Sequence, residues 1–172
     1  MCGYRGAVAT PREALLEQLR AAFPRTPIPE QPPGAYGWTY LDVPEVRALV
    51  EGKSWEDIDR VGLARRDDVM GFLGPELFAA LLPAYLLAFI DARDGENPTG
   101  MLTQCLAKPD KATGRGMGMG RPRFRALVAA LTPAQRCAVA EALLLHAETH
   151  PDSDDDTRRA LLYWAAYLPR PR

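Results

Sequence analysis

The chain has 172 residues, of which 47% are hydrophobic and 25% are charged, a balance typical of one globular domain that buries its own core. Its formal net charge of -1 argues against a general nucleic-acid coat and against a polybasic membrane anchor. Three widely spaced cysteines, Cys2, Cys105 and Cys137, match neither a disulfide framework nor a metal pattern, which fits a reducing cytoplasm.

The first predicted helix starts at the sequence TPRE. Thr10 is expected to cap it, with Pro11 at the first helical position and Glu13 completing a capping box. Pro24 is expected to end it. The next residues, 24–38, read PRTPIPEQPPGAYGW, and their five prolines predict an extended arm on the surface.

Helices of different character are predicted in the middle of the chain. A short one is expected over 42–52, another is expected to be capped by Ser54, and a third spans 63–73. The longest covers 75–91 and is apolar nearly all round, which predicts the middle of a bundle. Its uncharged run of 14 residues is shorter than the roughly 20 that a membrane span needs. Pro83 predicts a kink or a break inside it.

The second half of the chain continues the helical pattern. Helices are predicted over 99–107, 121–131, 132–149 and 152–168, and no stretch shows the sustained period-two alternation of a strand. The predicted fold is therefore all-α, a single-domain irregular bundle of about six to eight helices around the buried helix at 75–91.

A glycine- and arginine-rich segment, predicted to be a mobile loop, occupies residues 108–121. Its alternating glycines precede a helix, as in phosphate cradles, but no strand comes before them and the Walker lysine is missing. The wider region 108–125 holds six basic residues and one acidic residue. It is interpreted as a solvated loop, as a recognition loop for an acidic protein, or as a contact to nucleic acid. The residues expected to contact a protein are Arg115, Met117, Met119, Arg121 and Arg123.

An acidic cluster, ETHPDSDDD, lies at 148–156 and contains five carboxylates and no lysine or arginine. Asp154, Asp155 and Asp156 are predicted to contact a basic partner. The plainer interpretation is a loop followed by a helix N-terminus, where acidic side chains are favourable. The spacing and central glycine of an EF-hand are absent from this cluster.

Two histidines, His146 and His150, lie one helical turn apart and could share a metal ion. A zincin needs its glutamate directly after the first histidine, whereas Glu148 is displaced by one residue. Asp152 is a further candidate ligand, but no complete set is apparent, and no metal is predicted. The alternative is one partly buried histidine and one that stabilises the helix C-terminus.

Nucleophilic catalysis is not favoured by the sequence. Cys105 and Cys137 occur in apolar helical surroundings, which are typical of inert thiols. The chain has two serines, Ser54 and Ser153, and both have the context of a cap or a loop. No catalytic residue is predicted.

Four stretches together resemble a small bacterial all-helical family known only as a domain of unknown function. They are GKSWEDI (52–58), LGPELFAALLPAYLLAFI (73–90), LTPAQRCAVAEALLL (131–145) and ALLYWAAYL (160–168). Their shared features are packing motifs, namely a tryptophan anchor, a Leu-Pro step in an apolar helix and a Thr-Pro cap. The resemblance runs from about residue 11 to about 168 without 99–121. It implies a helical fold and no activity.

The function expected from these observations is that of a non-enzymatic cytoplasmic bacterial protein that binds another protein through its charged segments. One form would be an immunity-type protein that plugs a toxin or masks a partner. No cofactor or membrane association is expected, and the sequence identifies no small-molecule substrate. Two alternatives stay open: a metal-dependent enzyme using the helix end at His146 and His150, and a nucleic-acid binder using 108–125.

Overall fold

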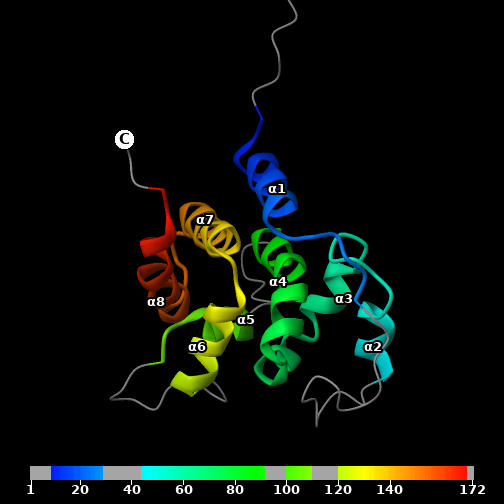
Figure 1. Cartoon of the computed structure of the whole chain (residues 1–172). Coiled ribbons are helices and arrows are strands. Elements are labelled where there is room, and N and C mark those ends of the chain that lie inside the picture. Colours follow the sequence, from blue (N-terminus) through cyan, green and yellow to red (C-terminus); the bar gives the residue numbers. More distant parts are fainter. Residues whose placement is uncertain (1–8, 29–43, 92–99, 110–119, 170–172) are drawn as a thin grey trace, which may run out of the picture.

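Eight α-helices and two 3₁₀ helices make up the part of the chain that the computed structural model describes, residues 9–28, 44–91, 100–109 and 120–169 (Figure 1). Among these residues there is no β-strand, only an isolated parallel bridge between Ile28 and Glu51. The predicted all-α fold is confirmed. In chain order the helices are α1 (Pro11–Ala22), α2 (Pro44–Val50), α3 (Arg60–Ala64), η1 (Asp67–Phe72), α4 (Pro75–Ile90), α5 (Gly100–Leu106), α6 (Arg121–Ala130), α7 (Pro133–Thr149), α8 (Asp155–Trp164) and η2 (Ala165–Tyr167).

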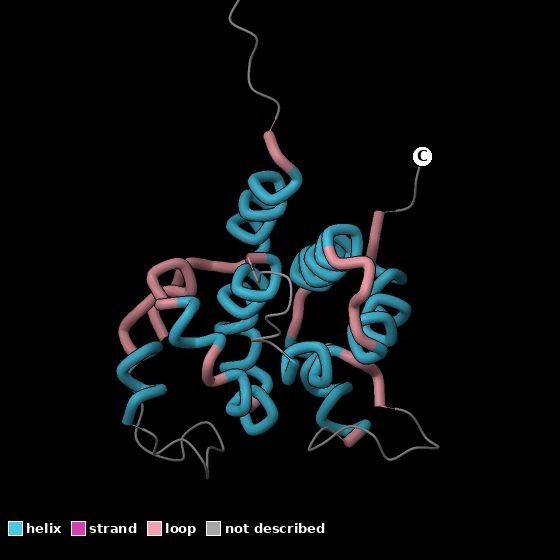
Figure 2. Tube along the Cα trace, turned by 180° about the vertical axis from the view of Figure 1, so that it is seen from behind, coloured by secondary structure: helices cyan, strands magenta, loops and turns pink. Residues whose placement is uncertain are grey.

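Helix α4 is the centre of the fold. It contacts α1, α3, α6 and α7, so that α2 and α3 lie on one side of it and α5 to α8 on the other (Figures 1 and 2). Every residue from 81 to 89 is buried, because the apolar sequence leaves no polar face to turn outward. Of the kink or break predicted at Pro83, the break is wrong, since α4 continues through this residue. Pro83 is itself buried within α4.

Helix α1 begins as its sequence predicts. The Thr10 hydroxyl accepts a hydrogen bond from the Glu13 amide at 3.2 Å, and the Glu13 carboxylate accepts one from the Thr10 amide at 2.7 Å. The buried residues Leu15 and Leu19 face the core. The Arg12 guanidinium donates to both carboxylate oxygens of Asp91, at 2.6 and 2.8 Å, and so joins the start of α1 to the end of α4.

The predicted helix cap at Ser54 is wrong. The Ser54 hydroxyl bonds to Asp57 within a turn, and the next helix starts later, at α3, where the Asp59 carboxylate accepts from the Val61 amide at 3.1 Å. The helix predicted over 63–73 is divided into the end of α3 and the 3₁₀ helix η1. The predicted anchor Trp55 is 2% exposed, as expected of a core ring.

The proline-rich arm is described only at its start. Residues 24–27 are exposed and non-helical, as predicted, whereas Ile28 is buried and its amide donates to the Lys53 carbonyl at 2.9 Å. Gly52 ends the preceding helical turn with a φ of 70°, a left-handed conformation that favours glycine. The rest of the predicted arm, 29–38, lies outside the described residues, as do 110–119 of the predicted loop.

Helices α7 and α8 are built from strong local signals. Thr132 and Gln135 form a second capping box at the start of α7. The Trp164 indole N–H donates to the Leu106 carbonyl at 2.9 Å and thereby fixes α8 against the end of α5. Helix α7 contacts α1, α4 and α8. The groove described below lies on the side of α7 that faces α1.

No single helix in the described ranges is long and apolar enough to cross a membrane. Helices α6 and α7 meet the length and hydropathy requirement only as a pair, and they are bent by 111° at the break between them.

Candidate protein-binding groove

The two histidines form a stack at the junction of α4 and α7. The His146 ring lies on the Phe89 ring with centroids 3.5 Å apart, and the His150 ring lies 4.2 Å from that of His146. His146 Nδ1 is 3.1 Å from the Phe89 carbonyl oxygen, in the last turn of α4, where carbonyls lack a partner within the helix. His150 Nδ1 is 3.2 Å from the His146 carbonyl oxygen. His150 Nδ1 is also 2.9 Å from the Thr149 hydroxyl oxygen, so both Nδ1 atoms already have hydrogen-bond partners within the protein.

Burial and the neighbouring His150 lower the pKa of His146 to about 4, against the smaller opposing effects of the Phe89 carbonyl and Asp154. The ring is neutral at physiological pH and acts as a structural cap. Within the described ranges, no three His, Cys, Asp or Glu side chains come together as a metal-binding group. Asp152, the further ligand considered from the sequence, is exposed in the turn after α7.

The acidic cluster marks the beginning of α8. The Asp154 carboxylate accepts a hydrogen bond from the Thr157 amide at 2.7 Å, which makes Asp154 the N-cap. Asp155 lies 3.6 Å from the guanidinium of Arg158 one turn later. These contacts match the plainer interpretation of the cluster, because carboxylates at a helix N-terminus satisfy free amides and favour the helix dipole.

Asp156 also has an internal partner. Its carboxylate is 3.0 Å from the guanidinium of Arg159, which in turn donates to the Lys108 carbonyl at 3.1 Å. Through Arg159, the acidic cluster is thus linked to Lys108, which lies two residues after the end of α5 and is the first residue of the basic region. That Asp154, Asp155 and Asp156 contact a partner stays a prediction.

The predicted basic contact residues are described only in part. Arg115, Met117 and Met119 lie outside the described residues. The Arg123 guanidinium donates to the Leu73 carbonyl at 2.7 Å, just before α4, and so contributes to packing of α6 on α4. Arg121 is half-buried, and its Nε atom is buried without a hydrogen-bond partner.

Neither described thiol is activated. Cys105 is 1% exposed, and burial raises its pKa to about 12. Cys137 is half-buried, 3.6 Å from the Gln18 amide nitrogen and 3.8 Å from a Glu141 carboxylate oxygen. Burial raises the pKa of the Cys137 thiol, and the Glu141 charge raises it further. Both cysteines are therefore poor nucleophiles at neutral pH.

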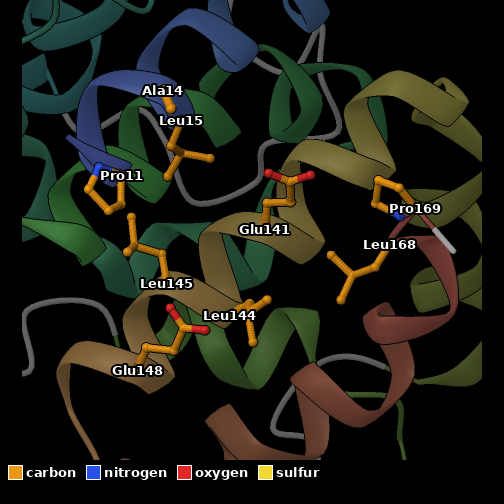
Figure 3. A pocket seen from close by; sticks show the side chains of 9 residues that line it. All are labelled: Pro11, Ala14, Leu15, Glu141, Leu144, Leu145, Glu148, Leu168 and Pro169. Carbon is orange, nitrogen blue, oxygen red and sulfur yellow. The ribbon is translucent and has the colours of Figure 1, made fainter. Parts of the chain in front are cut away.

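A groove of about 410 Å³ runs between α1, α7 and the chain that follows η2 (Figure 3). It combines small and apolar side chains with two carboxylates. Its lining residues are Pro11, Ala14 and Leu15 from α1, Glu141, Leu144, Leu145 and Glu148 from α7, and Leu168 and Pro169 from the end of the described chain.

The spacing of the α7 residues explains how the groove arises. Glu141, Leu144, Leu145 and Glu148 stand at helical positions i, i+3, i+4 and i+7, so they share one face of the helix. The two leucines are half-buried and lie between the two glutamates along α7 (Figure 3). Leu143, in contrast, is fully buried in the core. Helix α7 therefore has an apolar surface on the groove side as well as its core-facing surface.

The two glutamates of the groove have no ion-pair partner in the part of the chain that the structure describes. Glu148 is exposed, and Glu141 is half-buried with Cys137 as its neighbour. The groove consequently pairs an apolar floor with negative charge at two points two helical turns apart. This arrangement is suited to binding an apolar surface that is flanked by positive charge.

The motifs of the sequence do not predict this groove. A signal was present in the sequence ALLLHAET after Glu141, since its leucines extend around more of the helix than one core face requires. Which leucines remain uncovered depends on where Leu168 and Pro169 pass, and this placement has no local signal. No protein-family model, curated protein or solved structure matches the chain. The resemblance to a bacterial helical family stays a prediction.

Proposed function

We propose that this chain is a non-enzymatic binding protein whose groove between α1 and α7 holds a basic amphipathic helical segment of a partner protein. The observation that carries the proposal is the pair of carboxylates, Glu141 and Glu148, that border the apolar floor without an ion-pair partner among the described residues. A groove of this kind binds an amphipathic helix through apolar anchors and selects it by charge.

The dimensions of the groove fit such a segment. Its volume of about 410 Å³ can hold a few apolar side chains from one face of such a helix. Glu141 and Glu148 are separated by about 10.5 Å along the axis of α7, given a rise of about 1.5 Å per residue. Two lysines or arginines seven residues apart on a partner helix would meet both carboxylates. Their aliphatic stems would cover the flanks of the apolar floor.

The same chemistry supports a masking role. A protein that covers a basic amphipathic segment prevents that segment from reaching nucleic acid, a membrane or an active site, which is how an immunity-type protein would act. The neutral, backbone-bonded His146 and the unactivated thiols of Cys105 and Cys137 also favour binding over catalysis.

The proposal is tested with a synthetic helical peptide of leucines and lysines that carries two lysines seven residues apart. Fluorescence anisotropy of the labelled peptide is expected to show saturable binding to the protein. A peptide with glutamates in place of the lysines is expected not to bind. Glu141→Gln with Glu148→Gln should weaken binding about 5- to 30-fold, since each exposed ion pair is worth up to about 1 kcal/mol.

Matched variants separate the groove from general surface charge. Glu76→Gln with Asp68→Asn removes the same charge from exposed positions outside the groove and should leave binding unchanged. Ala14→Trp fills the groove at an exposed helical position and should abolish binding, whereas Ala126→Trp on the exposed side of α6 should not. Equal binding by the Ala14→Trp and wild-type proteins would show that the groove is not the binding site.

A further inference from the structure

Two tyrosines, one in the last turn of α8 and one in η2, lie at the opposite end of α8 from its acidic N-terminus. Tyr163 and Tyr167 are one helical turn apart, and their hydroxyl oxygens are 3.5 Å from each other. Both side chains are half-buried. The Phe124 ring packs edge-on against Tyr163 at 4.9 Å, and the buried Trp164 ring lies 5.5 Å from that of Tyr167. These contacts hold the two phenol groups in place.

Each tyrosine ring is accompanied by a cation. Lys108 Nζ lies 5.8 Å from the centroid of the Tyr163 ring, and the Arg136 guanidinium carbon lies 5.6 Å from that of Tyr167. Arg136 Nε donates to the Val128 carbonyl at 3.0 Å, which orients the guanidinium and leaves its other N–H groups available. Neither cation has a carboxylate partner in the described ranges.

The Tyr163 hydroxyl remains a protonated donor. Burial and the neighbouring Tyr167 hydroxyl raise the pKa of Tyr163 to about 12, while the charge of Arg136 acts to lower it. The Arg136 guanidinium lies over the ring of Tyr167, whose hydroxyl is the neighbour of the Tyr163 hydroxyl. Only one hydroxyl proton is needed for the bond between the two oxygens, so the other is available to a ligand.

We propose that Tyr163, Tyr167, Lys108 and Arg136 form a binding site for a phosphate monoester. Two cations without carboxylate partners in the described chain match the charge of -1.5 to about -2 that a phosphate monoester carries near pH 7. A carboxylate would neutralise only one of them. The guanidinium N–H groups, the ammonium and a phenol O–H are the donors that phosphate oxygens accept. This site shares no residue with the groove, so either proposal can fail alone.

The two probes are inorganic phosphate and a peptide that contains O-phosphoserine. Each is titrated into the protein, and the resonances of the tyrosine rings are followed by NMR. Saturable shifts of Tyr163 and Tyr167 are expected, and sodium chloride at equal ionic strength is expected to cause none. Stronger binding of the peptide supports a phosphoprotein as the source of the ligand. Stronger binding of inorganic phosphate supports a small phosphorylated molecule.

Two kinds of variant test the assigned residues. Tyr163→Phe with Tyr167→Phe keeps both rings and both cations but removes the hydroxyls, and it should weaken phosphate binding at least about tenfold, measured by calorimetry. Lys108→Gln should also weaken phosphate binding at least about tenfold, while both tyrosine rings and both hydroxyls stay in place. Arg65→Gln, an exposed residue after α3, is the control with equal charge loss. Wild-type affinity in either test variant, or shifts that chloride reproduces, would overturn the proposal. Glu141→Gln with Glu148→Gln should leave phosphate binding unchanged.

Discussion

Two sets of acidic side chains, on the neighbouring helices α7 and α8, have different surroundings in the folded protein. The carboxylates of Asp154, Asp155 and Asp156 contact a backbone amide or an arginine within α8. Those of Glu141 and Glu148 border an apolar groove and have no ion-pair partner among the described residues. The density of charge along a sequence therefore does not tell which carboxylates already have partners within the chain.

The position of each acid within its helix strengthens the contrast. The three aspartates are at the cap and first turn of α8, where the positive end of the helix dipole favours them. Glu148 is in the last turn of α7, where the same dipole opposes a negative charge. Helix stability explains the aspartates but not Glu148, which supports a role for Glu148 in binding.

The largest expected effect tests whether α7 has two different apolar faces. Leu143→Ala, on the fully buried face, should lower the free energy of unfolding by about 2–5 kcal/mol, because it leaves a cavity in the core. Leu144→Ala, on the groove side, should cost clearly less, because this side chain is only half-buried. Urea unfolding followed by circular dichroism measures both. Equal costs would mean that the groove side of α7 is part of the core.

The second prediction concerns His146, which lies between the end of α4 and the acidic start of α8. In the unfolded chain its pKa is about 6.5, whereas in the folded protein it is about 4. Above about pH 6.5 both forms are neutral, and the contribution of His146 to stability is fully present. As the pH falls toward about 4, the unfolded chain gains a proton that the folded protein does not, so stability decreases by up to about 3 kcal/mol.

The measurement for His146 is the difference in unfolding free energy between wild type and His146→Gln, taken at about pH 7 and at about pH 4.5. The variant should show a smaller loss over this interval, since the carboxylates titrate in both proteins and cancel. The charge of Asp154 raises the pKa of His146, so Asp154→Ala should lower that pKa further. An NMR titration showing a pKa of His146 near 6.5 would contradict the buried, neutral assignment.

Much of the fold could be predicted because its signals are local. The capping boxes at Thr10 and Thr132 begin α1 and α7 where the sequence places them, and Pro75 begins α4. The errors occur where a local signal competes with another contact. Ser54 was expected to begin a helix, yet its hydroxyl bonds to Asp57, and Asp59 caps the helix instead.

The candidate groove could not be predicted in the same way. Its α7 side is visible in the sequence as a helical pattern of leucines and glutamates. Its other sides come from α1, which is more than a hundred positions away along the chain, and from the chain near Leu168. Whether Glu141 finds a cation depends on which side chains of α1 face it. Packing of α1 against α7 decides this, and no single helix encodes it.

The smallest expected effect is a difference in stability between variants of Asp154 and of Glu148. Asp154→Ala removes the N-cap of α8 and should lower the free energy of unfolding by about 1 kcal/mol. Glu148→Gln removes a charge that opposes the dipole of α7 and should raise it by about 0.3–1 kcal/mol at low salt. Thermal unfolding at low and high salt measures both changes. The gain from Glu148→Gln should shrink with added salt, while the loss from Asp154→Ala, which is mainly a lost hydrogen bond, should persist. A loss of stability in Glu148→Gln would show that this carboxylate has a structural role after all, and the contrast between the two sets of acidic side chains would then disappear.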